Sequence, residues 1–422
     1  MRLSRLLSLV PLADAAPRAK RSEPAPLLIP RSVSTGDLVA NQYVVKFKKS
    51  STIAAVEEAI NSLSLPNGAG ELFREVFPGF AGHFDAATLD LIRGHPEVSC
   101  LQRIGTVRSA EVLMRIILKV QYVEQNTKMV AFAPATQSPS TWGLARISHE
   151  TRGASNYLYD SSSGSGTCSY IVDSGIDTSH SEFGGRAEQI KSFIGPNDDS
   201  CGHGTHVAGT IGSNTYGVAK KTTLLGIKVI DYNNRTRECE GPTIGILRGL
   251  EYVAQDVAHR NCPKGVVVNM SLGGSFSQAS NDAVAELVSK GFFVAVAAGN
   301  GDEKKGPMDA GDVSPASERS ACTVGASDRN DRIAHFSNYG SMIDIHAPGV
   351  DIVSLKNGGG TALGSGTSMA TPHVAGLAAY FMGQGRAAAG MCEFLQNISV
   401  KNAISGMHHD TKNLLAQNDR AG

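Results

Sequence analysis

The sequence has no long hydrophobic run and no excess of charge of either sign. None of its apolar stretches reaches the roughly 18 residues that a membrane-spanning helix needs. The 39 basic side chains are balanced by 39 acidic ones, so the formal net charge is zero. Such a balance gives no indication of a nucleic-acid or anionic-lipid surface. We therefore expect no nucleic-acid and no membrane partner, and we expect a monomer.

The chain is long and rich in glycine. Its 422 residues exceed one minimal domain and suit a large core with an appendage. The apolar fraction of 41%, the charged fraction of 18% and the 46 glycines describe a globular chain with many turns. We therefore expect an ordered protein of two domains.

The first residues have the pattern of a secretory signal. Arg2 and Arg5 precede a short apolar core, and small residues follow at positions 13 and 15. This pattern predicts a signal peptide over residues 1–16, cleaved near Ala15 or Ala16, and a secreted, extracellular product. The alternative is a disordered N-terminus, because the apolar core is brief. In an oxidising compartment the seven cysteines would favour pairing.

Residues 17–134 have the pattern of a small α+β domain. A linker rich in Pro, Arg and Ser is expected over residues 17–40. Alternating and helical periodicities then predict the following elements: strand 41–49, helix 51–63, strands within 72–84, helix 86–95 and strand 122–132.

Residues 100–121 interrupt this small domain. They separate HPEV from YVEQ, which would otherwise join naturally, and they contain the only cysteine outside the larger domain. One interpretation is a variable surface loop. Our hypothesis is an intron retained in the gene sequence, so that 100–121 is a spurious insertion. Sequencing the transcript distinguishes the two, because mature message that carries these codons would exclude an intron.

Residues 135–422 have the pattern of an α/β domain. Continuous runs of Val and Ile alternate with helical segments, which predicts a mostly parallel sheet with helices on both faces. Strands are expected at 168–175, 224–231, 264–273, 292–300, 321–327 and 341–349. Ligands of such sheets bind beyond the carboxyl ends of the strands. The polar residues that end these runs are therefore the candidate site residues.

The stretch GTSMATPHVAG places Ser368 between a glycine-bearing turn and a run of small residues. It predicts a buried helix that begins at the serine, with Pro372 in its first turn. The free N–H groups and the positive dipole end of a helix N-terminus favour a developing negative charge. A serine hydroxyl is a weak nucleophile unless a base takes its proton, so a base is required elsewhere in the chain.

Asp173 and His203 are the candidates for an acid and a base. Asp173 ends the expected strand SYIVD, and His203 lies in SCGHGTHVAGTIG. Taken singly, the aspartate suits a turn, and the histidine suits a metal site with His206, although further ligands are lacking. The order Asp, His, Ser is that of one known catalytic triad, and this combination favours nucleophilic catalysis.

Five motifs in order, YIVDSGID, GHGTHVAGTIG, SLGG, VAAGN and SGTSMATPHVAGLAAY, resemble the subtilisin-like serine peptidases of the proteinase K subfamily. The likeness extends over residues 135–422. It implies that Ser368 attacks the scissile carbonyl, that His203 takes its proton and that Asp173 holds the imidazole. It also implies that Asn300 forms the oxyanion hole with the backbone N–H of Ser368. No cofactor is expected for catalysis.

The resemblance further implies a secreted endopeptidase of broad specificity that acts on proteins and peptides through an acyl-enzyme. Ser271, Leu272 and Gly273 would pair with an extended substrate, and Gly299 would help to form the pocket floor. We expect a preference for aromatic or large aliphatic residues. The segment 232–245 is longer than in the subfamily and carries Arg235, Arg237, Glu238 and Glu240, so the distal subsites should differ.

Disulfides, a metal and a propeptide are implied by the same resemblance. The implied pairs are Cys168 with Cys262 and Cys322 with Cys392, whereas Cys201 and Cys239 are either free or form a third bridge, which we favour. A structural calcium would be held by the carboxylate of Asp344 and the backbone carbonyls of Arg319 and Ala321, the alternative being an ordinary surface aspartate. Residues 17–134 resemble the inhibitor propeptide of these enzymes, with self-cleavage expected within 131–135.

A second hypothesis from another class is a catalytically silent or permanently inhibited relative that only binds peptides. The interrupted propeptide favours it, because a propeptide that cannot fold would leave the larger domain unfolded. The complete set of Asp173, His203, Ser368 and Asn300 favours the active enzyme. Other serine hydrolases fit poorly, since GTSMA lacks the second glycine of the GxSxG elbow.

Overall fold

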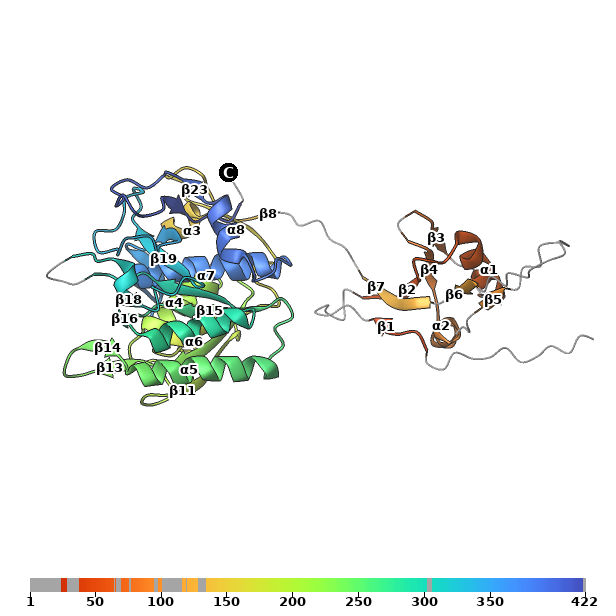
Figure 1. Cartoon of the computed structure of the whole chain (residues 1–422), viewed down its shortest axis with the longest axis horizontal. Coiled ribbons are helices and arrows are strands. Elements are labelled where there is room, and N and C mark those ends of the chain that lie inside the picture. Colours follow the sequence, from red (N-terminus) through yellow and green to blue (C-terminus); the bar gives the residue numbers. More distant parts are fainter. Residues whose placement is uncertain are drawn as a thin grey trace, which may run out of the picture. The chain divides into compact units, whose positions relative to one another are not determined.

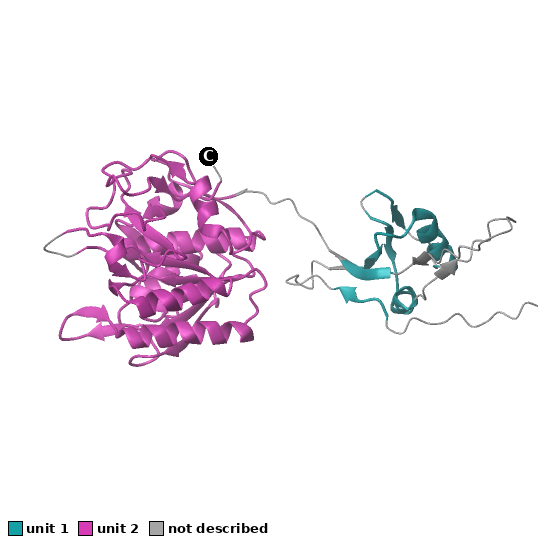
Figure 2. Cartoon of the chain, in the orientation of Figure 1, with its two compact units in different colours: residues 1–130 teal, residues 131–422 magenta. Residues whose placement is uncertain are grey.

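The computed structural model describes residues 24–28, 38–63, 65, 70–75, 77–94, 98–100, 116–118, 120–127, 134–301 and 306–419. The chain (Figure 1) divides into two compact units, residues 1–130 and 131–422 (Figure 2). The expected boundary between residues 134 and 135 lies slightly beyond this division. Within the described ranges, no helix combines the length and the apolar character needed to cross a membrane.

The described part of the first unit has two helices, a five-stranded sheet in the order β1-β7-β2-β4-β3 and a separate antiparallel pair, β5 with β6. Its elements are β1 (Leu27–Leu28), β2 (Leu38–Phe47), α1 (Ile53–Leu63), β3 (Glu71–Phe73), β4 (Gly79–His83), α2 (Ala86–Arg93), β5 (Val98–Cys100), β6 (Ile116–Leu118) and β7 (Val120–Thr127). Val56 and Ala59 of α1 pack with Phe47 and Phe80 of the sheet. The expected α+β class is confirmed. The prediction of a linker over residues 17–40 is wrong at β1, because this short strand pairs with β7.

Strand β7 begins two residues before its expected start and so includes the end of the suspected insertion. Val120 pairs with Phe47 and is only 5% exposed. A chain without residues 100–121 would place Val98 and Ser99 directly before Tyr122, in the positions of Val120 and Gln121. The core would therefore keep a valine at this point. Residues 101–115 of the suspected insertion lie outside the described residues, and the intron hypothesis stays a prediction.

The second unit is built on a nine-stranded sheet in the order β11-β12-β10-β15-β17-β19-β20-β24-β23. Its strands are β10 (Cys168–Asp173), β11 (Ala187–Ser192), β12 (Thr223–Lys228), β15 (Val266–Met270), β17 (Phe293–Ala297), β19 (Cys322–Ser327), β20 (Ile345–Pro348), β23 (Val400–Lys401) and β24 (Leu414–Leu415). All neighbours pair in parallel except β23 and β24. The expected mostly parallel sheet is confirmed.

Helices cover both faces of this sheet (Figure 1). They are α3 (Trp142–Arg146), α4 (His203–Gly212), α5 (Thr243–Asp256), α6 (Gln278–Ser289), α7 (Thr367–Gly383) and α8 (Met391–Ile398). Residues of α4 and α7 belong to one apolar core, and residues of α5 and α6 belong to another. The remaining strands form short pairs at the rim: β8 (Pro134–Gln137) with β9 (Tyr157–Asp160), β13 (Asp231–Asn233) with β14 (Glu238–Glu240), β16 (Gly274–Ser275) with β18 (Val313–Ser314), and β21 (Ile352–Leu355) with β22 (Thr361–Gly364).

Helix α7 begins at Thr367, one residue earlier than expected. Pro372 is its sixth residue and therefore lies in the second turn, not in the first as predicted. A proline has no N–H to donate to the carbonyl four residues before it, here that of Ser368. The side-chain hydroxyl of Ser271 donates to this carbonyl instead, at 2.9 Å. Because Pro372 leaves the carbonyl of Ser368 without its helical donor, this carbonyl can bind Ser271, and the hydrogen bond connects α7 to the segment after β15.

Three disulfides lie in the second unit. They are Cys168–Cys262, Cys322–Cys392 and Cys201–Cys239, which include the two pairings that the resemblance implies. The third bridge joins the loop before α4 to strand β14, so the two cysteines are not free. It connects the hairpin β13–β14 to the start of the helix that carries His203.

Candidate active site

Asp173 and His203 meet at the carboxyl edge of the sheet. Asp173 is the last residue of β10 and is fully buried, whereas His203 is the first residue of α4, with a side chain 26% exposed. The Nδ1–H of His203 donates to Oδ1 of Asp173 at 2.7 Å. This bond fixes the tautomer, so Nε2 is left as a proton acceptor.

Asp199 holds the start of α4 in place. Its buried carboxylate accepts hydrogen bonds from the backbone N–H groups of Gly202 and Thr205, at 2.8 and 2.9 Å. It also accepts the hydroxyl of Ser174, the residue after Asp173, at 2.7 Å. Sequence reasoning missed Asp199. The signal was a carboxylate shortly before a helix start, which is typical of N-terminal capping.

The charge around His203 favours its protonated form. Burial alone would lower the pKa of the imidazole, but the carboxylate of Asp173, through its charge and its hydrogen bond, and the charge of Asp199 together raise that pKa above 6.5. Because only the neutral ring can accept a proton, a reaction that uses His203 as a base is lost as the pH falls through this raised pKa.

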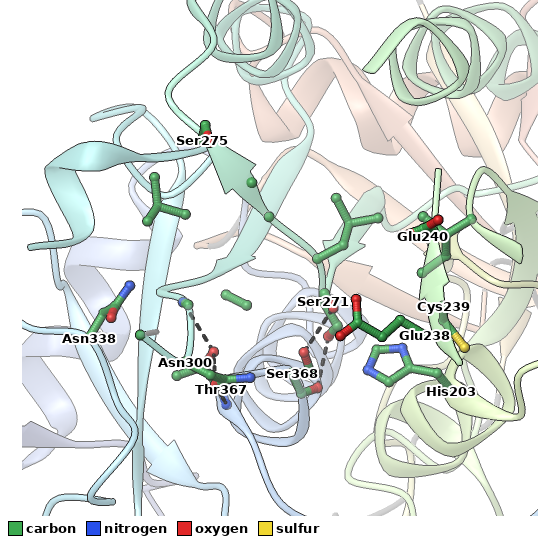
Figure 3. A pocket seen from close by; sticks show the side chains of 18 of the residues that line it. His203, Glu238, Cys239, Glu240, Ser271, Ser275, Asn300, Asn338, Thr367 and Ser368 are labelled. Atoms are coloured by element: carbon green, nitrogen blue, oxygen red, sulfur yellow. Dashed lines mark hydrogen bonds between the residues drawn. The ribbon is translucent and has the colours of Figure 1, made fainter. Parts of the chain in front are cut away.

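The hydroxyl of Ser368 lies in the same cleft as His203 (Figure 3). It donates to the backbone carbonyl of Ser271 at 2.9 Å. Among the described residues no hydrogen bond joins Ser368 to His203, so the hydroxyl must turn away from Ser271 before its proton can reach the imidazole. Catalytic hydrogen bonds are often incomplete without substrate.

Asn300 and Ser368 can offer two hydrogen-bond donors to one oxyanion. The side-chain oxygen of Asn300 accepts the backbone N–H and the hydroxyl of Thr367, at 2.8 and 2.9 Å. The amide NH2 group is therefore free to point toward Ser368, as Figure 3 shows. Thr367, whose hydroxyl also accepts the N–H of Gly299 at 3.1 Å, was not predicted from the sequence.

The expected substrate residues line a single cleft of ≈ 580 Å³ together with His203 and Ser368. These residues are Ser271, Leu272, Gly273 and Gly299. A Cβ on Gly299 would lie 2.5 Å from the amide of Asn338, and one on Gly273 would lie 3.2 Å from Val313. The φ of +97° at Gly299 also favours glycine. Neither glycine therefore has free space for a side chain, and both lie against Val313 or Asn338, which line the same cleft.

The metal alternative for His203 and His206 is not supported by their contacts. His206 is buried, and its Nε2 lies 3.1 and 3.2 Å from the carbonyls of Ile352 and Ala362. In the described part of the chain, potential metal-ligating side chains cluster in two groups, Cys322 with Asp344 and Cys392, and His408 with His409 and Asp410, and neither group includes His203 or His206.

The model of the subtilase family matches residues 164–414, which include all three of Asp173, His203 and Ser368. The chain belongs to the subtilase family. This subtilase is 44% identical to Proteinase R of Parengyodontium album over the full length of both chains. It is 44% identical to the cuticle-degrading protease of Metarhizium anisopliae over 99% of this chain and 100% of that protein.

The subtilase also resembles a solved structure, that of a cold-adapted subtilisin-like serine proteinase. The TM-score is 0.59 at 37% identity, over 67% of this chain and 99% of the other. A second family model, peptidase inhibitor I9, matches residues 42–103 in the first unit. The predictions of a serine endopeptidase of the proteinase K type and of an inhibitor-type propeptide are therefore confirmed.

The predicted calcium ligands lie away from the active cleft of the subtilase. Arg319, Ala321 and Asp344 line one cavity of ≈ 340 Å³. Oxygen ligands from these residues suit calcium. The carboxylate of Asp344, however, already accepts the ammonium of Lys412 at 2.9 Å and the backbone N–H of Thr323 at 3.1 Å. A cation at this position would therefore compete with Lys412.

Proposed function

We propose that this subtilase is a secreted, monomeric endopeptidase of broad specificity that cleaves its own propeptide. One observation carries the proposal: the hydrogen-bonded pair of Asp173 and His203 shares a cleft with Ser368 and Asn300. Secretion is supported by the predicted signal peptide. Broad specificity is supported by the part of the cleft beside Gly299, where the lining residues Val313 and Asn338 offer an apolar side chain and a neutral amide.

In this proposal Ser368 attacks the scissile carbonyl after its hydroxyl turns from Ser271 to Nε2 of His203. The imidazole accepts the proton, and the resulting imidazolium is stabilised by the carboxylate of Asp173. The carbonyl oxygen becomes an oxyanion, which the amide of Asn300 and the N–H of Ser368 would bind. In subtilisin, a member of this family, the corresponding asparagine is worth about 10² to 10³ in rate.

The imidazolium then gives its proton to the leaving amine, and the acyl-enzyme forms. Water takes the place of the amine in the second half of the reaction, with His203 again as the base. The vacated carbonyl of Ser271 would become available to a substrate N–H. Binding of an extended peptide along residues 271–273 would therefore favour the turn of the Ser368 hydroxyl toward His203.

We expect the secreted product to begin within residues 131–135. The full-length precursor and a variant without residues 100–121 should be expressed side by side and their secreted products sequenced from the N-terminus. If the stretch is a retained intron, the shorter chain should yield more mature enzyme, because it restores a continuous HPEVSYVEQ segment. A mature start far from residue 131 in both would contradict self-cleavage at this junction.

We also propose that calcium binds at Asp344 only after Lys412 leaves. Replacing Lys412 with methionine removes the competing ammonium, so calcium should stabilise this variant more than the natural enzyme. The rise in Tm that calcium causes should be larger in Lys412→Met than in the natural enzyme. The excess should be about 2–4 °C for each kcal/mol of added binding free energy. Thermal unfolding in calcium and in EGTA measures it, with the exposed Lys401→Met as the control. Equal calcium dependence in the natural enzyme and the Lys412→Met variant would contradict the competition.

A further inference from the structure

The active cleft carries negative charge on the side of the hairpin β13–β14. Its lining includes the carboxylates of Glu238 and Glu240 on the hairpin and that of Asp312 outside the hairpin, and none of the described lining residues is a lysine or an arginine. The hairpin overlaps the segment 232–245, which the resemblance predicts to be longer than in the proteinase K subfamily. This wall of the cleft could therefore give the chain a substrate preference that differs from that of its relatives.

The hairpin fixes where Glu238 lies. Strands β13 and β14 pair in antiparallel register, with Asn233 opposite Glu238 and Tyr232 opposite Cys239. Because side chains alternate along a strand, Glu238 and Glu240 share one face and Cys239 points to the other. The disulfide from Cys239 to Cys201 attaches the hairpin two residues before His203. The disulfide thus holds the hairpin backbone near the start of α4, and Glu238 and His203 line the same cleft.

Glu238 and Glu240 differ in what they contact. The carboxylate of Glu240 accepts a hydrogen bond from the amide of Asn233 across the hairpin. No hydrogen bond or ion pair engages the carboxylate of Glu238 within the described residues. Figure 3 shows this carboxylate reaching from the hairpin into the cleft, beside His203 and toward Ser271. An unpaired charge that faces the substrate path can select the charge of the substrate.

The position of Glu238 specifies which substrate residue it would meet. In the proposed reaction, the residue that supplies the scissile carbonyl would place its side chain in the part of the cleft that Gly299, Val313 and Asn338 line. In an extended peptide the preceding residue points to the opposite side. Figure 3 shows Asn338 on one side of Ser368, and His203 with Glu238 on the other. The preceding side chain would therefore lie beside His203 and under Glu238.

We propose that Glu238 is a specificity-determining residue that favours lysine or arginine at the substrate position immediately before the residue held in the main pocket. The inference rests on the proposed peptidase function. A long basic side chain would bring its cation to the carboxylate of Glu238, whereas an acidic side chain would be repelled. Glu238 is exposed to solvent, so its effect on a bound cation should weaken as the ionic strength rises.

The test uses three quenched peptides that differ only at this position, which is lysine, glutamine or glutamate. We expect the natural enzyme to show the highest kcat/KM on the lysine peptide and the lowest on the glutamate peptide. In Glu238→Gln the ratio of kcat/KM for lysine over glutamine should fall about fivefold. The lysine preference of the natural enzyme should also shrink between low salt and about 0.5 M salt.

The matched control is Glu240→Gln, which removes the same charge from the same face of the same hairpin. In this variant the ratio of kcat/KM for the lysine peptide over the glutamine peptide should stay closer to that of the natural enzyme. The reason is that the Glu240 carboxylate is hydrogen-bonded to Asn233. An unchanged ratio in Glu238→Gln, or an equal fall in both variants, overturns the assignment to Glu238. Active-site titration with a fluorophosphonate counts competent enzyme in each sample, so failure of the peptidase function is distinguished from loss of the preference.

Discussion

Replacing Ser368 with alanine is expected to lower kcat by about 10⁶-fold, the loss known for the catalytic serine of subtilisin. The variant keeps the backbone N–H and Asn300 of the oxyanion hole, but it has no nucleophile to form the acyl-enzyme. The alanine side chain is smaller than serine and fits the same helix start, so the fold should be retained. Self-cleavage of the precursor should stop as well, because it uses the same hydroxyl.

Two measurements check this expectation. A fluorophosphonate probe should label the natural enzyme and should not label Ser368→Ala, and the residual kcat should be measured on a peptide substrate. Ser365→Ala is the control, since this exposed hydroxyl lies three residues away and accepts the backbone N–H of Asp351. Labelling that persists in Ser368→Ala would show that another residue is the nucleophile. Thermal unfolding of both variants shows whether the fold is intact.

The sequence was most informative where one local pattern determines both the element and its place in the fold. The six expected strands of the second unit all lie in the central sheet, because long runs of buried Val and Ile suit strands covered on both faces. Asp173, His203 and Ser368 could be singled out because each lies in a motif rich in glycine and small residues. The described contacts bring Asp173 and His203 together and place Ser368 in the same cleft.

Contacts that join distant segments could not be predicted in this way. Lys412 and Asp344 are 68 residues apart, and only the arrangement of the C-terminal segment brings their side chains together. Thr367 orients the amide of Asn300 across a separation of 67 residues. Strand β1 is only two residues long and has no periodicity of its own to indicate it. Such features depend on tertiary packing, which overrides local propensity.

Pro372 illustrates how a correct motif can still mislead about geometry. Proline is common in the first turn of a helix, so placing it there was the natural expectation. In the structure Pro372 lies in the second turn, and the carbonyl of Ser368, which receives no N–H from residue 372, accepts the hydroxyl of Ser271. The same two residues exchange a second bond from the hydroxyl of Ser368 to the carbonyl of Ser271. Ser368 is thus hydrogen-bonded in both directions to the segment after β15, which is expected to bind the substrate.

Replacing Asp173 with asparagine is expected to lower kcat by about 10⁴-fold. The buried carboxylate accepts the Nδ1–H of His203 at 2.7 Å and so leaves Nε2 free to accept a proton. An asparagine amide can donate to Nδ1 instead, which would stabilise the wrong tautomer. It also carries no charge to stabilise the imidazolium that forms during the reaction.

The same variant should change the pH dependence in a predictable direction. The charge of Asp173 raises the pKa of His203, and only the neutral imidazole is active as a base. In the natural enzyme kcat/KM should therefore fall as the pH drops through a value above 6.5. Without the carboxylate the pKa of His203 should be lower, so the residual activity of Asp173→Asn should persist to lower pH. An identical midpoint in both pH profiles would mean that the ionisation of another group limits the reaction, because His203 cannot lose its carboxylate partner without a change in its proton affinity.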